Sequence, residues 1–283
     1  MDKLNVGTIY AMHVLGQLEN DDKYVVQKGR TEALLHTEKS YDPGDVVDVF
    51  VYKNEQKQFM AADQIPPVIV GTYGWVDVVD VIPHLGAYIS IGIGEDILVF
   101  KEDLPAFKSV WPEPEDKLFV TLKADSKDRL LAIPAKESYF QDMFEFANDV
   151  DLNEQVTGRV IRVDREGAVI YTEDGYRGFI HYTEREQEPR LGQVVTGRII
   201  EVKEDGSLNI SLLPMKHERL DDDAEKIYAY LTEVGGEMDF WDKSDAEAIK
   251  RTFHMSKSAF KRALGRLMKQ GKITQQDGKT KLN

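Results

Sequence analysis

The pattern of hydrophobic and polar positions changes near Pro214. Before it, short stretches rich in Val, Ile and Tyr alternate with polar positions and are separated by Gly, Asp and Asn. Alternation with a period of two is typical of half-buried β-strands. After Pro214, apolar residues recur at the spacing of a helix face. We therefore expect a mainly β protein with an α+β region after Pro214.

The strand pattern occurs three times along the chain. Each repeat contains a hairpin of similar length, over residues 23–36, 86–100 and 167–181. A candidate strand precedes each hairpin, over residues 6–12, 75–82 and 156–163, and a further hairpin follows it. Five strands within roughly 60–75 residues are typical of small closed barrels. The sequence therefore predicts three tandem five-stranded barrels.

The residues after Pro214 predict helices followed by a hairpin. Residues 221–236 open with acidic residues, which favour a helix start, and close with two glycines. Ser244 and Glu247 have capping-box spacing, which predicts Ser244 as the N-cap of a second helix. Helix, short strand, helix, turn, helix and hairpin is the order of a winged helix.

The third predicted helix begins after Ser256, a plausible N-cap, and ends at Gly271. Phe260, Leu264 and Leu267 fall on one of its faces. The pair 277–278, Asp-Gly, predicts a type I′ turn in the following hairpin, which would be the wing.

Breaks in the pattern suggest the domain boundaries. The stretch "IPP" at residues 65–67 marks one candidate boundary and Pro134 marks another, while residues 136–151 do not fit the repeat pattern. The predicted organisation is a first barrel at 1–66, a second at 67–135, a linker with some helix at 136–151, a third barrel at 152–216 and a winged helix at 217–283.

Charge is distributed unevenly along the chain. The net charge is −14, yet residues 243–283 carry 11 Lys and Arg against 3 Asp and Glu, about +8. The preceding residues carry 25 against 47, about −22. A basic region on an acidic chain is a reasonable footprint for a phosphate backbone. A merely solvated helix surface remains the alternative.

Several classes of function find no support in the sequence. Without cysteine, disulfides and thiolate metal sites are impossible, and this composition fits a reducing, cytoplasmic location. The sequence shows no long apolar span, no signal-peptide pattern and no nucleotide-binding or hydrolase motif. The acidic run at 218–225 fits a solvated helix start better than a metal site. We expect no enzyme activity, no cofactor and no metal.

The third repeat resembles an S1 RNA-binding domain over nearly its whole length, from "GRVIRVDREGAVIYTEDGYRGFIH" to "GSLNISLLP". An S1 domain is a five-stranded barrel of the oligonucleotide-binding type. Three such barrels before a winged helix, together with "HERLDDD" and "FWDKSDAEAIK", resemble the bacterial conserved virulence factor B family. The resemblance implies RNA binding and an influence on virulence-gene expression, and hence a regulator acting after transcription.

The S1 resemblance implies a binding face on the second and third strands of each barrel. Side chains two apart on a strand share a face, and exposed rings there stack on bases. In the third repeat Phe179 and His181 keep this pattern, and Val169 replaces an aromatic residue. The weaker candidates in the other repeats are Tyr24, His36, Tyr88 and Phe100, with Leu34 and Leu98 in the place of Phe.

Cations near these positions are candidate phosphate contacts. In the third repeat they include Arg159 and Arg177, with Arg162 and Arg165 nearby. In the winged helix the candidates occupy the polar face of the third helix and the wing: Lys257, Lys261, Arg262, Arg266, Lys269, Lys279 and Lys281. The helix face is poor in Asn and Gln, which favours phosphate binding over base reading.

We expect RNA, preferably single-stranded, to bind to the third barrel and the winged helix. Two rival hypotheses remain: a winged-helix regulator that binds DNA, and a scaffold whose acidic barrels dock to ribosome or transcription machinery. None of these involves a membrane or a small-molecule substrate.

Overall fold

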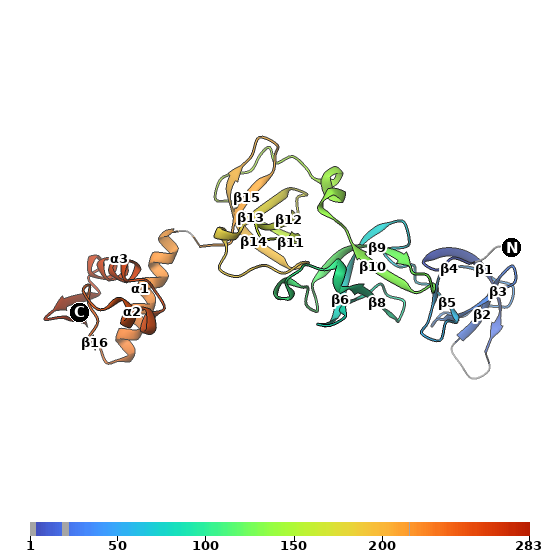
Figure 1. Ribbon diagram of the computed structural model, residues 1–283, viewed down its shortest axis with the longest axis horizontal. Coiled ribbons are helices and arrows are strands. Elements are labelled where there is room, and N and C mark those ends of the chain that lie inside the picture. Colours follow the sequence, from blue (N-terminus) through green and yellow to red (C-terminus); the bar gives the residue numbers. More distant parts are fainter. Residues whose placement is uncertain (1–3, 19–22, 215) are drawn as a thin grey trace. The chain divides into compact units, whose positions relative to one another are not determined.

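The computed structural model describes residues 4–18, 23–214 and 216–283, with only the backbone described for 216–222. The chain forms two compact units, Met1–Leu212 and Leu213–Asn283. The first contains three closed barrels and the second a helical domain with a small sheet (Figure 1).

In the described residues of the first unit, fifteen strands form three barrels. Barrel 1 contains β1 (Thr8–Gln17), β2 (Lys23–Lys28), β3 (Thr31–His36), β4 (Val46–Lys53) and β5 (Phe59–Ala62). Barrel 2 contains β6 (Tyr73–Ile82), β7 (Gly86–Ser90), β8 (Asp96–Phe100), β9 (Lys117–Ala124) and β10 (Leu130–Pro134). Barrel 3 contains β11 (Gln155–Val163), β12 (Gly167–Thr172), β13 (Arg177–His181), β14 (Val194–Val202) and β15 (Leu208–Ser211). Short 3-10 helices follow several strands: η1 (Lys101–Asp103), η2 (Lys108–Val110), η3 (Glu137–Met143) and η4 (Tyr182–Glu184).

All three barrels have the same topology, which confirms the predicted fold class. In each, the first strand pairs antiparallel with the second and fourth, and the third pairs in parallel with the fifth. The long first strand carries a register shift at equivalent places: Val14/Gly16, Val78/Asp80 and Val160/Arg162. A bulge bends a strand, so one strand can pair with both neighbours and close a small barrel.

Strand alternation places one set of side chains inside each barrel. In barrel 3 the inward residues of β12 and β13 are Ala168, Ile170 and Ile180, all fully buried. The residues between them, including Val169 and Phe179, project from the opposite face of the same strands. The hydrophobic run of β12 thus serves two cores, one inside the barrel and one outside it.

Barrels 1 and 2 are joined through backbone and side-chain contacts. The Val70 amide donates to the Gly7 carbonyl at 2.8 Å, and the Tyr52 hydroxyl donates to the Ile93 carbonyl at 3.1 Å. Lys53 and Asp128 form an ion pair at 2.7 Å. Burial, together with the charge of Glu95, raises the pKa of Tyr52 to about 12, so its hydroxyl remains a donor.

Barrels 2 and 3 share a second apolar core built around η3. Phe140 of η3 is 1% exposed and packs with Ile161 and Val169 of barrel 3. Its ring centroid lies 5.1 Å from that of Phe119 in barrel 2 and 5.6 Å from that of Tyr171 in barrel 3. The segment predicted as a linker, residues 136–151, therefore contributes a buried side chain to both neighbouring barrels.

The second unit is a winged helix, as predicted. Its elements are α1 (Lys216–Glu233), β16 (Glu237–Met238), α2 (Ala246–Phe253), α3 (Lys257–Lys269), β17 (Ile273–Gln276) and β18 (Lys279–Leu282). The strands form one sheet in the order β16-β18-β17. Phe260, Leu264 and Leu267 of α3 are buried in the core, as their spacing predicts.

The local signals in the second unit were mostly correct. Ser256 caps α3 by accepting from the Ala259 amide, and positive φ angles at Asp277 and Gly278 fit the predicted wing turn. The capping-box prediction was wrong. Asp245, not Ser244, caps α2 by accepting from the Glu247 and Ala248 amides, because Ser244 accepts from the Trp241 amide instead.

Among the helices of the described residues, none is long and apolar enough to cross a membrane.

The cluster around Phe140 gives a test of how barrels 2 and 3 are held. We expect Phe140→Ala to lower the free energy of unfolding by about 3–5 kcal/mol, because it leaves a cavity between two barrels. Hydrogen exchange of the full chain would show lost amide protection in β6, β9 and β12. Phe107→Ala, which truncates a ring that is 54% exposed, is the matched control. Equal protection in both variants would contradict the clamping role of Phe140.

Candidate nucleic-acid interface

The strand register identifies equivalent outward positions in the three barrels. In barrel 3, Val169 lies opposite Phe179 and Gly167 opposite His181. The corresponding pairs are Tyr88 with Leu98 and Gly86 with Phe100 in barrel 2, and Val25 with Leu34 and Lys23 with His36 in barrel 1. The register therefore supports the predicted equivalence of His36, Phe100 and His181.

In barrel 1 the register corrects one predicted position. Tyr24 pairs with Leu35, and both side chains are buried inside the barrel, where Tyr24 is 6% exposed. Its ring meets Tyr41 edge-on at a centroid distance of 5.8 Å. The outward residue at this point of the strand is Val25, so the prediction was displaced by one residue. A shift of one residue transfers a side chain to the other face of a strand.

Barrels 1 and 2 present only parts of a stacking surface. His36 is exposed, but its outward neighbours Val25 and Leu34 are aliphatic. In barrel 2, Tyr88 and Phe100 both lie on the outward face and are half-buried. The described residues of these barrels thus place no two exposed rings together on the predicted face.

In barrel 3 much of the predicted binding face is covered. Val169 is completely buried and Ile161 is 7% exposed, because η3 and strands of barrel 2 pack on them. In the sequence, Val169 stands where the S1 resemblance implies an aromatic residue. In the folded chain this position lies inside an interdomain core, where Phe140 supplies the aromatic contact.

The open end of this face carries three aromatic side chains, which we term the aromatic ledge: Phe179, His181 and Tyr182. His181 is exposed and Tyr182 is 57% exposed. Ring centroids are 6.3 Å apart for Phe179 and His181 and 4.3 Å apart for His181 and Tyr182. The Lys203 ammonium lies 5.9 Å from the centre of the Phe179 ring.

Local contacts hold the ledge in place. The His181 ring nitrogen Nδ1 lies 2.7 Å from the Thr183 hydroxyl, which fixes the ring orientation. The Phe179 ring lies over Gly167, where a Cβ atom would approach the ring carbon Cζ to 2.8 Å. Any larger residue at Gly167 would therefore displace Phe179.

Tyr182 is a ledge residue that sequence reasoning missed. Strict alternation places a residue after His181 on the opposite face of the strand. The strand ends at His181, however, and Tyr182 begins η4, so the turn brings its ring beside His181. The available signal was an aromatic residue next to the histidine at a predicted strand end.

The predicted arginines of barrel 3 are largely engaged within the protein. A terminal nitrogen of Arg159 donates to the Gly192 carbonyl at 2.7 Å, and its guanidinium lies 5.6 Å from the Trp75 ring centre. Burial lowers the pKa of Arg159, while Asp116 and Asp77 oppose that shift. Arg159 therefore belongs to the contact between barrels 2 and 3.

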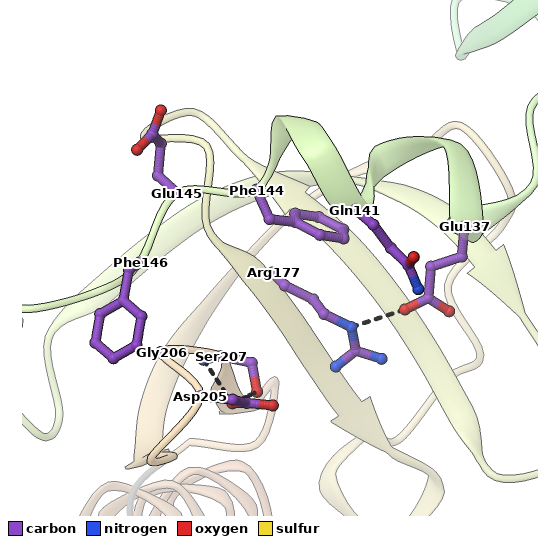
Figure 2. Close-up of a pocket in the computed structure, with 9 residues that line it drawn as sticks. All are labelled: Glu137, Gln141, Phe144, Glu145, Phe146, Arg177, Asp205, Gly206 and Ser207. Atoms are coloured by element: carbon purple, nitrogen blue, oxygen red, sulfur yellow. Dashed lines mark hydrogen bonds and ion pairs between the residues drawn. The ribbon is translucent and has the colours of Figure 1, made fainter.

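Glu137 of η3 binds two further arginines of this face. Its carboxylate pairs with Arg162 and with the Nε of Arg177, the latter at 2.7 Å (Figure 2). Arg162 also meets Asp164 at 3.1 Å. These pairs reduce the positive charge that the sequence suggested for phosphate contacts.

The winged helix presents cations on the polar face of α3. Lys261, Arg262 and Lys269 are exposed, while Lys257 and Arg266 are half-buried. The Lys257 ammonium donates to the Lys243 carbonyl at 3.3 Å. The helix thus keeps the basic face that its sequence predicted.

The lysines of the wing, by contrast, are paired. Lys279 contacts Glu237 at 2.7 Å and Asp239 at 3.2 Å, and Lys281 contacts Glu237 at 2.9 Å. Hydrogen bonds from Lys279 and Lys281 lower the pKa of Glu237 to about 2. The wing therefore adds less positive charge than its lysine count implies.

Within the part of the chain whose side chains are described, no group of three or more His, Asp or Glu is placed to hold a metal ion. The acidic run at 218–222 lies outside the described side chains.

Comparison with known families finds four matches in succession along the chain. Residues 6–62 match an S1 domain, and residues 73–133 match the CvfB first S1-like domain. Residues 140–214 match the second domain of virulence regulatory factor CvfB, and residues 225–282 match the CvfB-like winged helix domain.

Relatives match over nearly the full length. Conserved virulence factor B of Staphylococcus aureus (strain MSSA476) is 39% identical over 287 residues, covering 100% of this chain and 95% of that protein. Protein YitL of Bacillus subtilis (strain 168) is 42% identical over 265 residues, covering 93% and 89%. A crystal structure of a multidomain protein with nucleic acid binding domains from Streptococcus pneumoniae TIGR4 is 35% identical, with a TM-score of 0.68 and 99% coverage of both chains.

The ion pairs of the wing predict an acid-sensitive contact. Because the pKa of Glu237 is lowered from 4.5 to about 2, its stabilising contribution is present above about pH 4.5 and is lost as pH falls toward 2. We expect Lys279→Gln with Lys281→Gln to return this pKa toward 4.5. A carbon NMR titration of the Glu237 carboxyl in the full chain measures it, with Lys269→Gln as control. An unchanged midpoint in the double variant would exclude these lysines as the cause.

Proposed function

The chain belongs to the conserved virulence factor B family, and we propose that it is a non-catalytic RNA-binding protein that regulates gene expression after transcription. The names conserved virulence factor B, of the Staphylococcus aureus relative, and virulence regulatory factor CvfB, of the matching second domain, support a regulatory role linked to virulence. The nucleic acid binding domains of the pneumococcal structure support the same class of ligand. In this proposal single-stranded RNA contacts barrel 3 and, through its backbone, the winged helix.

The aromatic ledge is the observation that carries this proposal. It offers two exposed rings, His181 and Tyr182, beside the half-buried Phe179 and the cation Lys203. Stacking of a base on an aromatic side chain contributes about 1–3 kcal/mol and requires an unpaired base. Exposed rings at the end of a barrel strand therefore favour single strands over duplexes.

The basic face of α3 supplies the electrostatic part of the interaction. Lys261, Arg262 and Lys269 are exposed, and Lys and Arg attract phosphates whatever the base sequence. Glycine at position 265 interrupts this face, and a Cβ atom there would meet no neighbour within 4 Å. The helix thus has room for a nucleic acid backbone but lacks the amide side chains that suit adenine edges.

Barrels 1 and 2 have a different role in this proposal. Residues 1–135, which contain both barrels, carry 22 Asp and Glu against 13 Lys and Arg, and the outward faces of both barrels present incomplete aromatic sets. An acidic surface repels phosphate. We assign them to holding barrel 3 in place and to contacts with other proteins, for which ribosome and transcription machinery are the candidates.

The ledge can be tested by removing its rings one at a time. We expect Tyr182→Ala and His181→Ala each to weaken binding of single-stranded RNA by about fivefold to 150-fold, the equivalent of one lost stacking contact. Phe179→Leu, which installs the residue that barrels 1 and 2 carry, should have a similar effect with little loss of packing. Fluorescence anisotropy at one fixed salt concentration measures the affinities.

Phe107→Ala is the control for these variants, because it removes an exposed ring of barrel 2 outside the ledge. If the ledge variants weaken RNA binding no more than Phe107→Ala does, the proposed stacking site is refuted. Clearly tighter binding of duplex DNA than of single-stranded RNA by the wild-type chain would favour the DNA-binding rival instead.

The basic helix makes a separate prediction about salt. The combined variant Lys261→Gln, Arg262→Gln and Arg266→Gln should lower RNA affinity and flatten the dependence of log affinity on log salt concentration by about 2 units, since each lost phosphate contact removes about 0.7. Lys226→Gln, Lys250→Gln and Arg251→Gln remove the same charge from exposed positions of α1 and α2. If the two triple variants show equal slopes of log affinity against log salt concentration, α3 is not the phosphate-binding face, and the scaffold hypothesis is favoured.

A further inference from the structure

A pocket of about 360 Å³ lies beside the aromatic ledge, between η3 and the turn that joins β14 to β15. Its lining includes Phe144 and Phe146 from the segment after η3, Arg177 from β13, and Asp205 and Ser207 from the turn (Figure 2). It combines one cation, carboxylates and aromatic rings within a single barrel surface.

Arg177 is held ready to donate hydrogen bonds into this pocket. Its Nε donates to Glu137, whose side chain is only 16% exposed and is itself fixed by Arg162. The terminal nitrogens of Arg177 form no hydrogen bond with the described residues, and Figure 2 shows both of them below Nε, toward the part of the pocket where Asp205 lies. A guanidinium oriented through Nε presents two parallel donors to a ligand.

Asp205 supplies the opposite kind of group. One of its oxygens, Oδ1, accepts from the amide and the hydroxyl of Ser207, at 3.0 Å and 2.7 Å. Its other oxygen, Oδ2, accepts no hydrogen bond from the described residues, and the carboxylate is attracted by the charges of Lys203 and Arg177. Hydrogen bonds from Ser207 lower the pKa of Asp205, so the carboxylate stays ionised and acts only as an acceptor.

Aromatic rings form part of the wall. Phe144 is held by Phe140 and Tyr171, with centroid distances of 6.2 Å and 5.9 Å. Phe146 is 52% exposed and lies against the backbone of Gly206, where a Cβ atom would approach its ring carbon Cγ to 2.5 Å. A flat ligand can therefore contact a ring while its edge meets Arg177 and Asp205.

We propose that this pocket binds one unpaired guanine base of the RNA strand that crosses the aromatic ledge. Guanine carries two adjacent acceptors, O6 and N7, which match the paired donors of an arginine. It also carries two adjacent donors, the N1–H and the 2-amino group, for a carboxylate such as Asp205. Cytosine lacks the pair of donors, and adenine and uracil lack both pairs. The surplus of carboxylates in the lining disfavours a phosphate in the same place.

The pocket and the ledge are continuous along one strand. Arg177, Phe179 and His181 occupy alternate positions of β13 and project from the same face. Alternate residues of a strand are about 6.6 Å apart. The β14–β15 turn flanks both sites, since Lys203 lies at the Phe179 ring and Asp205 lines the pocket with Arg177. An RNA strand whose bases stack on His181 and Phe179 would therefore lead toward the pocket.

The inference rests on the proposed RNA binding and can be tested by varying one base. We expect the full chain to bind a uridine oligonucleotide with one central guanosine about tenfold more tightly than the all-uridine oligonucleotide. Inosine, which lacks the 2-amino group, and 7-deazaguanosine, which lacks N7, should each lose most of this preference. These ligand changes leave the protein fold untouched. Isothermal titration at one salt concentration measures the affinities.

Protein variants assign the preference to the pocket. Arg177→Met and Asp205→Asn should each bring the ratio of the guanosine and all-uridine affinities close to one, whereas Arg30→Met, at an exposed position of barrel 1, should keep it near ten. Circular dichroism checks that each variant is folded. Equal affinity of the wild-type chain for both oligonucleotides overturns the pocket but leaves RNA binding intact. A preference that survives in both pocket variants also overturns it. Binding to neither oligonucleotide overturns the proposed function and the pocket with it.

Discussion

The burial of Phe140 between barrels 2 and 3 is the contact on which the candidate site depends. The ring is 1% exposed and joins Ile161 and Val169 of barrel 3 to aromatic residues of barrel 2. This packing covers the middle of the face on which an S1-type barrel would bind RNA. It leaves two openings on that face, the aromatic ledge at the end of β13 and the pocket beside Arg177. The same contact thus stabilises the first unit and restricts where a ligand can approach.

Ion pairs within the protein partly neutralise its cations and so limit the positive charge that is available to a ligand. Glu137 takes up Arg162 and Arg177, and Glu237 takes up both lysines of the wing. The exposed cations of α3 therefore attract a negatively charged ligand more strongly than their share of the total charge suggests. Ion pairing also orients side chains. The hydrogen bond from Arg177 to Glu137 fixes a guanidinium whose terminal nitrogens donate to none of the described residues.

The three barrels share one fold but differ in the side chains on their outward faces. All share the strand order and the bulged first strand, which close the barrel. Their outward faces differ, since barrel 3 ends in His181 and Tyr182 while barrel 1 has His36 beside aliphatic residues. Because the exposed outward residues, such as His181 and Tyr182, belong to neither core, they can change without loss of the fold. This separation allows the three barrels of the chain to keep one fold while their outward faces differ.

Sequence patterns were enough to predict the three barrels, the winged helix, the inward residues of α3 and the outward positions of Phe179 and His181. These follow from periodicity, turn residues and caps, which act over a few neighbouring residues. The folded chain was needed to show that Val169 lies in an interdomain core, that Tyr182 joins the ledge and that Arg159 and Arg177 are engaged within the protein. Each of these depends on contacts between residues far apart in the chain or on where a strand ends. Local patterns also left Tyr24 displaced by one position, because a one-residue change of register reverses the face of a strand.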